Sequence, residues 1–253
     1  MAALDELRRE AEACERCLLA DTRTRVVFGE GDPHADLMFV GEAPGYHEDQ
    51  QGRPFVGQAG KLLEQLLATI GLTRQQVYIA NVLKSRPPTN RDPKPEEIEA
   101  CEPFLLRQIE LIAPRVVCTL GNFSTKLLSG SQTGITRVHG IPQRTTIAGR
   151  ELFLYPIFHP AAALYTPAML ATLKEDVLRL PDVLALPLSG DEPEAQADHA
   201  AVATADGSDG PGASDGPDGN GASEGADAAP GRTAPAASPF AAPDGPAEQL
   251  GLF

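Results

Sequence analysis

The 253-residue sequence has no long apolar run and no apolar leader. A membrane-spanning helix needs about 20 consecutive apolar residues, and no stretch of this chain approaches that length. Residues 1–13 are rich in Ala, Glu and Arg, which predicts a short helix rather than a secretory signal. These absences predict a cytoplasmic protein without a membrane partner, in a compartment where disulfides are disfavoured.

Basic residues are almost missing from the last quarter of the chain. Residues 189–253 hold 12 acidic residues and one basic residue, Arg232, so they carry −11 of the formal net charge of −14. Residues 1–188 carry the remaining −3, from 23 acidic and 20 basic residues. Because this larger part is nearly balanced, the acidity of the whole chain does not exclude a nucleic-acid partner.

Large apolar side chains are also scarce in residues 189–247, where Ala, Gly, Pro, Asp and Ser dominate. Such a segment cannot bury enough apolar surface to offset its chain entropy, so we expect a disordered acidic linker. Residues 248–253 (EQLGLF) then add three apolar side chains. These side chains are either a chance feature or a peptide that docks into a partner's groove, with the linker as a tether.

Residues 1–188 alternate between two patterns. Apolar runs at 35–40, 77–83, 115–120 and 151–158 predict buried strands, whereas helical spacing predicts helices at 60–70, 95–112, 122–128 and 167–180. This alternation predicts one α/β domain over residues 1–188, a three-layer αβα fold with a four-stranded, mostly parallel central sheet. Ligands of such sheets bind at the carboxyl ends of the strands.

The chain has only four cysteines. Cys14 and Cys17 form a Cys-x-x-Cys pair after the predicted first helix, Cys101 lies in a predicted helix, and Cys118 lies in a predicted strand. Four thiolates bind either a zinc ion or an iron–sulfur cluster, and the spacing does not decide between them. For Cys118 a core position is an equally open interpretation, since free cysteine is often buried.

Two glycine-bounded loops follow the first predicted strand. Residues 41–45 (GEAPG) form a turn in which glycine lets the backbone approach a ligand closely. Residues 52–57 (GRPFVG) place the ring of Phe55 in a polar loop. That ring either plugs the core or stacks on a flat ligand.

Two polar side chains lie at the same predicted sheet edge. Asn81 ends an apolar strand, where an unpaired polar group would cost about 1–3 kcal/mol. Its amide offers one acceptor and one donor group, which matches the edge of a pyrimidine. His159 closes the fourth predicted strand, so it is a candidate functional residue rather than a structural histidine.

Residues 84–93 (KSRPPTNRDP) carry three cations, Lys84, Arg86 and Arg91, on a proline-rich loop. A loop of this kind is either a solvated surface segment or a set of contacts to nucleic-acid phosphates. Its position beside Asn81 favours the phosphate contacts.

Together these segments resemble the family 4 uracil-DNA glycosylases of the uracil-DNA glycosylase superfamily. The resemblance extends from about Leu4 to Leu180 and rests on the joint order and spacing of five motifs. These motifs are Cys14-x-x-Cys17, residues 41–45, residues 52–57, Asn81 with residues 84–88 (KSRPP), and His159-Pro160.

The resemblance implies an enzyme that flips deoxyuridine out of single- or double-stranded DNA and hydrolyses its N-glycosidic bond, leaving free uracil and an abasic site. Phe55 then stacks on the uracil, Asn81 reads its polar edge, and His159 donates toward O2. Glu42 is our candidate for placing the attacking water, with Glu48 and Asp49 as rivals. The implied uracil-binding residues are Gly41, Glu42, Ala43, Phe55, Asn81 and His159, and the implied DNA-contacting residues are Lys84, Arg86 and Arg91.

The resemblance also implies a structural [4Fe–4S] cluster. Many relatives carry a cysteine in a Lys-Cys-Arg-Pro-Pro segment, and this chain has Ser85 at that position. A four-thiolate cluster must then recruit Cys118. The implied ligands are therefore Cys14, Cys17, Cys101 and Cys118.

The last five residues, from Gln249 to Phe253 (QLGLF), resemble the clamp-binding pentapeptide of bacterial replication and repair proteins. This resemblance implies a sliding clamp as partner of an otherwise monomeric enzyme. Two alternatives stay open: a non-catalytic nucleic-acid-binding module with a structural metal site, and a glycosylase of the same fold with different base specificity. Phe55 and Asn81 discriminate, because a mere binder needs no pyrimidine pocket.

Overall fold

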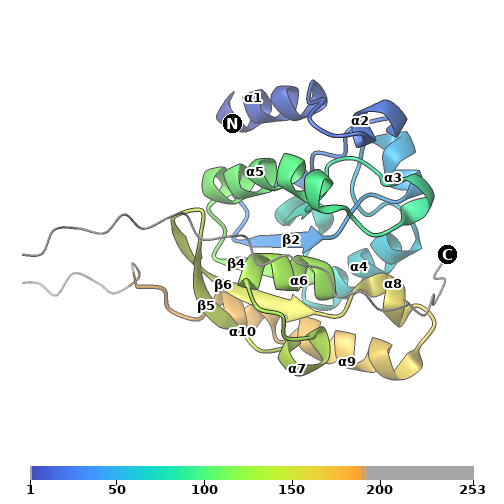
Figure 1. The fold of residues 1–253 in the computed structure, drawn as a ribbon. Helices are drawn as coiled ribbons and strands as arrows, with labels where there is room; N and C mark the ends of the chain where they lie inside the picture. Colours follow the sequence, from blue (N-terminus) through green and yellow to red (C-terminus); the bar gives the residue numbers. More distant parts are fainter. Residues whose placement is uncertain (1, 190, 192–253) are drawn as a thin grey trace, which may run out of the picture. The chain divides into compact units, whose positions relative to one another are not determined.

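A computed structural model of the chain describes residues 2–189 and 191, which form a six-stranded sheet with the strand order β1-β3-β2-β4-β6-β5 (Figure 1). The strands are β1 (Glu30–Gly31), β2 (Leu37–Gly41), β3 (Tyr78–Asn81), β4 (Val116–Leu120), β5 (Gln143–Ile147) and β6 (Arg150–Ile157). The four central strands are parallel, and β1 and β5 pair antiparallel at the two edges.

Ten α-helices and two short 3-10 helices are described. The α-helices are α1 (Ala2–Glu12), α2 (Leu19–Thr22), α3 (Tyr46–Gln51), α4 (Gln58–Thr69), α5 (Pro95–Ile112), α6 (Asn122–Ser129), α7 (Ile135–Val138), α8 (Pro160–Ala163), α9 (Pro167–Leu178) and α10 (Leu180–Leu184). The 3-10 helices are η1 (Arg74–Gln76) and η2 (Pro88–Asn90).

The three-layer αβα prediction is confirmed, and so are its four parallel strands. The two edge strands were not predicted. β1 has only two residues, and β5 reads Gln-Arg-Thr-Thr-Ile with its polar side chains alternately exposed. Neither strand contains the continuous apolar run that marks a central strand buried on both faces.

Two apolar cores lie on opposite faces of the sheet. One packs α4, α9 and α10 against one face, and the other packs α5 and α6 against the opposite face (Figure 1). Alternate residues of each strand enter alternate cores, as the two-residue period of a strand requires. In β4, for example, Cys118 lies in the first core and Val117 in the second.

Helix α5 connects the second core to the amino-terminal segment. It starts with Pro95 in its first turn, where Glu97 accepts a hydrogen bond from the Lys94 backbone N–H at 2.9 Å, and it ends at Ala113 in a left-handed conformation. Its outer face packs Phe104 against Leu7 and Ala11 of α1. This packing brings the segment after α1, which carries the Cys-x-x-Cys pair, next to α5.

The folded part continues slightly past the boundary predicted at residue 188. The Ser189 N–H donates to Glu151 at 2.8 Å, and Asp191 pairs with Arg115 at 2.6 Å. Otherwise the predicted linker (189–247) and terminal peptide (248–253) lie outside the described residues. Among the helices of the described part, none is both long and apolar enough to cross a membrane.

Candidate active site

Four predicted site residues meet at the carboxyl edge of the parallel strands. Gly41 ends β2 directly opposite Asn81, which ends β3. The ring of Phe55 lies between this pair and His159, with 5.7 Å between the Phe55 and His159 ring centroids. A Cβ on Gly41 would overlap Asn81 Oδ1 and lie 2.7 Å from Phe55 Cζ, so only glycine leaves room for these side chains.

The backbone at Phe55 is held in an unusual conformation. Its φ is 51°, in the left-handed region that non-glycine residues rarely occupy. The buried guanidinium of Arg74 donates to the carbonyls of Phe55 (2.8 Å) and Pro54, and Glu48 Oε1 accepts from the N–H groups of Val56 and Gly57, both at 2.9 Å. These contacts fix the ring against the strand ends.

Asn81 presents an unsatisfied acceptor. Among the described residues, its Oδ1 is the one buried side-chain nitrogen or oxygen without a hydrogen-bond partner. Leaving such a group unpaired costs about 1–3 kcal/mol, and strain of this kind is typical of binding sites. A flat ligand lying against Phe55 with an N–H at its edge would satisfy this oxygen.

His159 is arranged as a neutral hydrogen-bond donor. Its Nδ1 accepts from the Ala161 backbone N–H at 3.1 Å, so the ring proton of the neutral form lies on Nε2. Burial lowers the pKa of His159 to about 4, and the Glu48 carboxylate opposes this shift only partly. The ring is therefore uncharged at neutral pH and can donate from Nε2.

Glu42 and its two rivals differ in how their carboxyl groups are used. Burial raises the pKa of Glu42 to about 7, and the nearby Asp92 adds to the shift. Glu48 is engaged by the 55–57 loop, and Asp49 accepts from the Thr24 N–H at 2.9 Å, so both hold the backbone in place.

The backbone of the 41–43 turn is tied to the next strand. Val82 N–H donates to the Gly41 carbonyl and Leu83 N–H to the Glu42 carbonyl, each at 3.0 Å, while Ala43 packs against the second core. The turn is thus rigid. It fixes the backbone of Glu42 directly after Gly41.

The prediction that Lys84 contacts DNA is wrong. Its side chain is buried in the second core, where Nζ donates to the Asn81 carbonyl at 2.8 Å and to Gln108 Oε1 at 2.6 Å. Burial lowers the pKa of Lys84 to about 7, an effect opposed by the nearby Cys101 thiolate form. Lys84 therefore supports the strand that presents Asn81.

The two arginines of the same loop have different surroundings. Arg86 is partly exposed, lies 5.3 Å over the ring of Tyr46, and donates to Asn90 at 2.7 Å. Arg91 makes two hydrogen bonds to Glu97, which is almost fully buried. Arg86 is thus the better placed of the two for a phosphate.

Three of the four cysteines are neighbours. Cys17 packs against the core that contains Cys101, and Arg16 links the Cys14 Sγ (3.4 Å) to the carbonyl of Ala100 (2.6 Å). Burial raises the pKa of the Cys101 thiol, and the proximity of Cys17 and Cys14 adds to this shift.

The prediction that Cys118 joins these cysteines is wrong. Cys118 lies in the middle of β4 and faces the first core, on the side of the sheet opposite to Cys101. Its charged neighbour is Asp176 of α9, and burial raises the pKa of the thiol well above its usual value. Cys118 is therefore a core residue, the alternative left open by the sequence.

The three neighbouring cysteines do not form a closed site for a single metal ion. Among the described residues, no three His, Cys, Asp or Glu side chains are close enough to hold one metal ion, as a zinc site with bonds of about 2.3 Å would require.

Comparison with known proteins agrees with this arrangement. Residues 28–180 match the family described as the uracil DNA glycosylase superfamily. The chain belongs to this superfamily. Its matched region contains Gly41, Phe55, Asn81 and His159, the residues that meet at the carboxyl edge of the sheet.

Within the superfamily, the chain is most extensively similar to type-4 members among the relatives compared. It is 46% identical to a type-4 uracil-DNA glycosylase of Sulfurisphaera tokodaii over 192 residues, 74% of this chain and 87% of that protein. It is 45% identical to the Archaeoglobus fulgidus type-4 protein over 71% of this chain and 92% of that protein. A type-5 protein of Thermus thermophilus is 34% identical over 41% of this chain and 54% of that protein. The family 4 resemblance is confirmed.

Three large apolar side chains on the segments that carry the site residues are exposed in this superfamily member, and the sequence patterns did not reveal them. Tyr165 is 71% exposed and follows α8, which begins directly after His159, and Leu164 beside it is also exposed. Tyr46 is 54% exposed at the start of α3. In the sequence these side chains cannot be told from core residues, because only the fold shows that no other described residue covers them.

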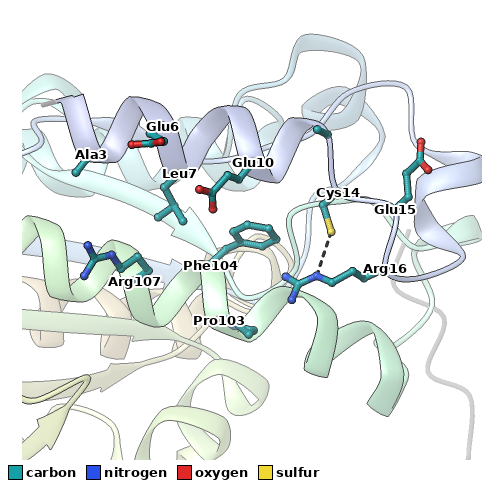
Figure 2. A pocket seen from close by; sticks show the side chains of 11 residues that line it. Ala3, Glu6, Leu7, Glu10, Cys14, Glu15, Arg16, Pro103, Phe104 and Arg107 are labelled. Atoms are coloured by element: carbon teal, nitrogen blue, oxygen red, sulfur yellow. Dashed lines mark hydrogen bonds between the residues drawn. The ribbon is translucent and has the colours of Figure 1, made fainter.

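A separate cavity of about 660 Å³ lies between α1 and α5, next to Cys14 (Figure 2). Figure 2 shows Leu7 of α1 next to the ring of Phe104 of α5 in its lining, with Arg16 reaching Cys14. Its lining includes none of the pocket residues at the carboxyl edge.

Proposed function

We propose that the chain is a uracil-DNA glycosylase, which hydrolyses the N-glycosidic bond of deoxyuridine in DNA to give free uracil and an abasic site. The observation that carries the proposal is the unpaired Asn81 Oδ1 next to the Phe55 ring and a neutral His159. These groups match a flat, uncharged ring with an N–H donor at one edge and carbonyl acceptors beside it.

Each group then has a distinct role. Phe55 stacks on the extruded base, and Asn81 accepts from uracil N3–H and donates to O4. His159 donates from Nε2 to O2, where negative charge develops as the glycosidic bond breaks. Removing one such fixed donor typically lowers a rate by about 10²- to 10³-fold. Glu42 orients the water that attacks the sugar carbon.

The enzyme must extrude the base before it can reach the glycosidic bond. Arg86 is proposed to hold a phosphate beside the pocket, stacked on Tyr46. The exposed Leu164 and Tyr165 are proposed to enter the space that the extruded base leaves. Apolar wedges of this kind stabilise unstacked duplexes.

Incubation of the purified protein with a uracil-containing oligonucleotide, followed by alkaline cleavage, tests this proposal. We expect a break at uracil and none in a thymine control. Asn81→Ala is expected to lower single-turnover excision by about 10²-fold or more, because the developing anion loses a partner. Gln50→Ala, which changes an exposed amide outside the pocket, is the matched control and keeps the full rate.

Two outcomes favour the alternatives. Binding without a strand break indicates a non-catalytic nucleic-acid-binding module. Faster cleavage at hypoxanthine or a mismatched thymine than at uracil indicates a glycosylase of this fold with different base specificity.

We further propose a [4Fe–4S] cluster at Cys14, Cys17 and Cys101. When bound, it crosslinks the segment after α1 to α5 and so supports the adjacent Lys84 and Asn81. Arg16 donates to the Cys14 Sγ and the Lys84 backbone N–H donates to the Cys101 Sγ, both at 3.4 Å, so a hydrogen-bond donor is already placed at two of the three sulfurs. A brown protein with iron–sulfur absorbance supports the cluster, and a colourless, zinc-containing one contradicts it.

Finally, residues 249–253 are proposed to bind a replication sliding clamp, tethered by residues 189–247. Deletion of residues 248–253 is expected to abolish clamp binding and to leave excision on short duplexes unchanged. Clamp binding by the shortened chain would contradict this role. The cytoplasmic location and monomeric state stay predictions.

A further inference from the structure

The cluster proposed above lacks one protein ligand. Cys118 cannot provide it, because its side chain lies in the core on the other side of the sheet. No histidine or carboxylate of the described residues joins the cysteines in a group of three that could hold a metal ion. Among the described residues, a donor of another residue type is then the candidate for the fourth position.

Ser85 directly follows Lys84, whose backbone contacts one of the three thiols. The backbone N–H of Lys84 donates to the Cys101 Sγ at 3.4 Å, and the Lys84 carbonyl accepts from the Val27 N–H at 2.7 Å. The backbone of Lys84 is thus held on both sides, and Ser85 is the next residue along the chain. Ser85 is only 4% exposed, and within the described part of the chain no hydrogen bond involves its hydroxyl, although this oxygen is not fully buried as Asn81 Oδ1 is.

We propose that Ser85 Oγ binds the iron atom that Cys14, Cys17 and Cys101 leave without a protein ligand. This inference rests on the proposed cluster. On binding, the hydroxyl loses its proton to solvent water and the alkoxide oxygen bonds the iron. The Arg16 guanidinium, which donates to the Cys14 Sγ, and the Lys84 backbone N–H, which donates to the Cys101 Sγ, stabilise this anionic set of ligands.

An oxygen ligand makes one iron atom different from the other three. Oxygen is a harder donor than thiolate, and soft thiolates are the preferred ligands of iron–sulfur clusters. That iron is therefore lost first on oxidation. With ferricyanide as oxidant, the [4Fe–4S]²⁺ cluster gives one electron to ferricyanide and releases Fe²⁺, which leaves [3Fe–4S]⁺ while Ser85 regains a proton.

Four full-length proteins test the assignment: the wild type and the variants Ser85→Cys, Ser85→Ala and Cys118→Ala. Each is purified without oxygen and loaded with ⁵⁷Fe. Mössbauer spectra distinguish the kinds of iron in each cluster. After ferricyanide treatment, a chelator measures the Fe²⁺ that is released, and electron paramagnetic resonance measures the [3Fe–4S]⁺ cluster that remains.

We expect one distinct iron in the wild type and four similar irons in Ser85→Cys, with iron release slowed by about tenfold or more, as for a repaired metal-ligand contact. Ser85→Ala is expected to release iron faster than the wild type. Cys118→Ala should match the wild type in spectrum and release rate, since Cys118 binds no iron.

Equal spectra and release rates for the wild type, Ser85→Ala and Ser85→Cys overturn the assignment. Loss of iron from Cys118→Ala overturns it as well and restores Cys118 as the ligand. Uracil excision is measured on the same samples, so that a failure of the Ser85 assignment can be told from a failure of the proposed cluster. An active wild type with a Ser85-independent cluster refutes this inference alone, whereas an active protein without iron refutes the proposed cluster.

Discussion

Two ionisable side chains at the pocket have pKa values moved in opposite directions by the same cause. Burial disfavours charge, so it lowers the pKa of His159 to about 4 and raises that of Glu42 to about 7. His159 therefore stays neutral throughout the physiological range. Glu42 changes its charge within it, which makes Glu42 the residue whose ionisation an activity profile should report.

We predict that single-turnover excision rises with pH between about 6 and 8 and then levels off. The raised pKa means that Glu42 keeps its proton up to about pH 7, and only the carboxylate orients water. Glu42→Gln is expected to lower the excision rate above pH 8 by about 10²-fold or more and to remove the rise of the rate between pH 6 and 8. Single-turnover excision rates, measured by rapid quenching from pH 5 to 9 for both proteins, test this prediction.

Protein stability gives an independent check on the same side chain. The folded pKa of Glu42 lies above its usual 4.5, so the folded state holds the extra proton between pH 4.5 and 7, and ionisation costs stability as the pH rises through this window. The free energy of unfolding of Glu42→Gln should therefore be higher, relative to that of the wild type, at pH 8 than at pH 5. An unchanged rate profile in Glu42→Gln excludes Glu42 as the water-positioning group.

Single residues also show where sequence reasoning fails. Lys84 follows a predicted strand in a loop with Arg86 and Arg91, so its pattern is that of a phosphate contact. Only the fold shows that Gln108, distant in sequence, offers it a buried acceptor. Cys118 was assigned by elimination, on the assumption that every ligand is a thiolate, and its position on the strand contradicts that assignment.

At the scale of elements, two segments hold the pocket loop from opposite sides. Arg74 of η1 binds the carbonyls of Pro54 and Phe55, and α4 approaches the same loop through Gly60. A Cβ at Gly60 would overlap the Phe55 carbonyl oxygen. The helix needs glycine here although glycine weakens helices.

We predict that Gly60→Ala destabilises the protein by about 1–3 kcal/mol, as overpacking does, although alanine favours a helix by about 1 kcal/mol. Because the Phe55 carbonyl must move, excision should also slow. Ala59→Gly is the control: it should cost about 1 kcal/mol through helix propensity and leave the excision rate unchanged. A Gly60→Ala variant with raised thermal stability and full activity would contradict this account of the loop.

The elements that position the pocket could be predicted because their signals are local. Apolar runs ending in Gly41 and Asn81 mark central strands, and the carboxyl-edge rule then brings both residues together. The edge strands β1 and β5 could not be predicted, because short or polar strands depend on pairing with a neighbour. The roles of Arg74 and Glu48 as loop supports likewise depend on contacts between segments.

For the whole molecule, charge separates sharply along the chain. Residues 189–253 carry −11, and residues 1–188 carry −3. Of the three predicted DNA cations, Lys84 is buried and Arg91 is paired with Glu97, which leaves Arg86. DNA binding should therefore depend on few phosphate contacts and more on the pocket that takes the base.

This balance predicts a shallow salt dependence of DNA affinity. Each neutralised phosphate contributes about −0.9 to the slope of log K against log salt on duplex DNA. Arg86→Ala is expected to reduce the slope by about that amount. Arg91→Ala should leave the slope unchanged but lower stability, because Glu97 is left buried without its partner.

Binding of a uracil-containing duplex, measured by fluorescence anisotropy over a range of salt concentrations, tests this prediction. Arg107→Ala, an exposed arginine paired with Glu110 on α5, controls for the loss of one positive charge and should not change the slope. If Arg91→Ala and Arg107→Ala reduce the slope as much as Arg86→Ala does, affinity follows overall charge. An effect confined to Arg86 instead means that one arginine, stacked on Tyr46, fixes the DNA backbone while the pocket selects the base.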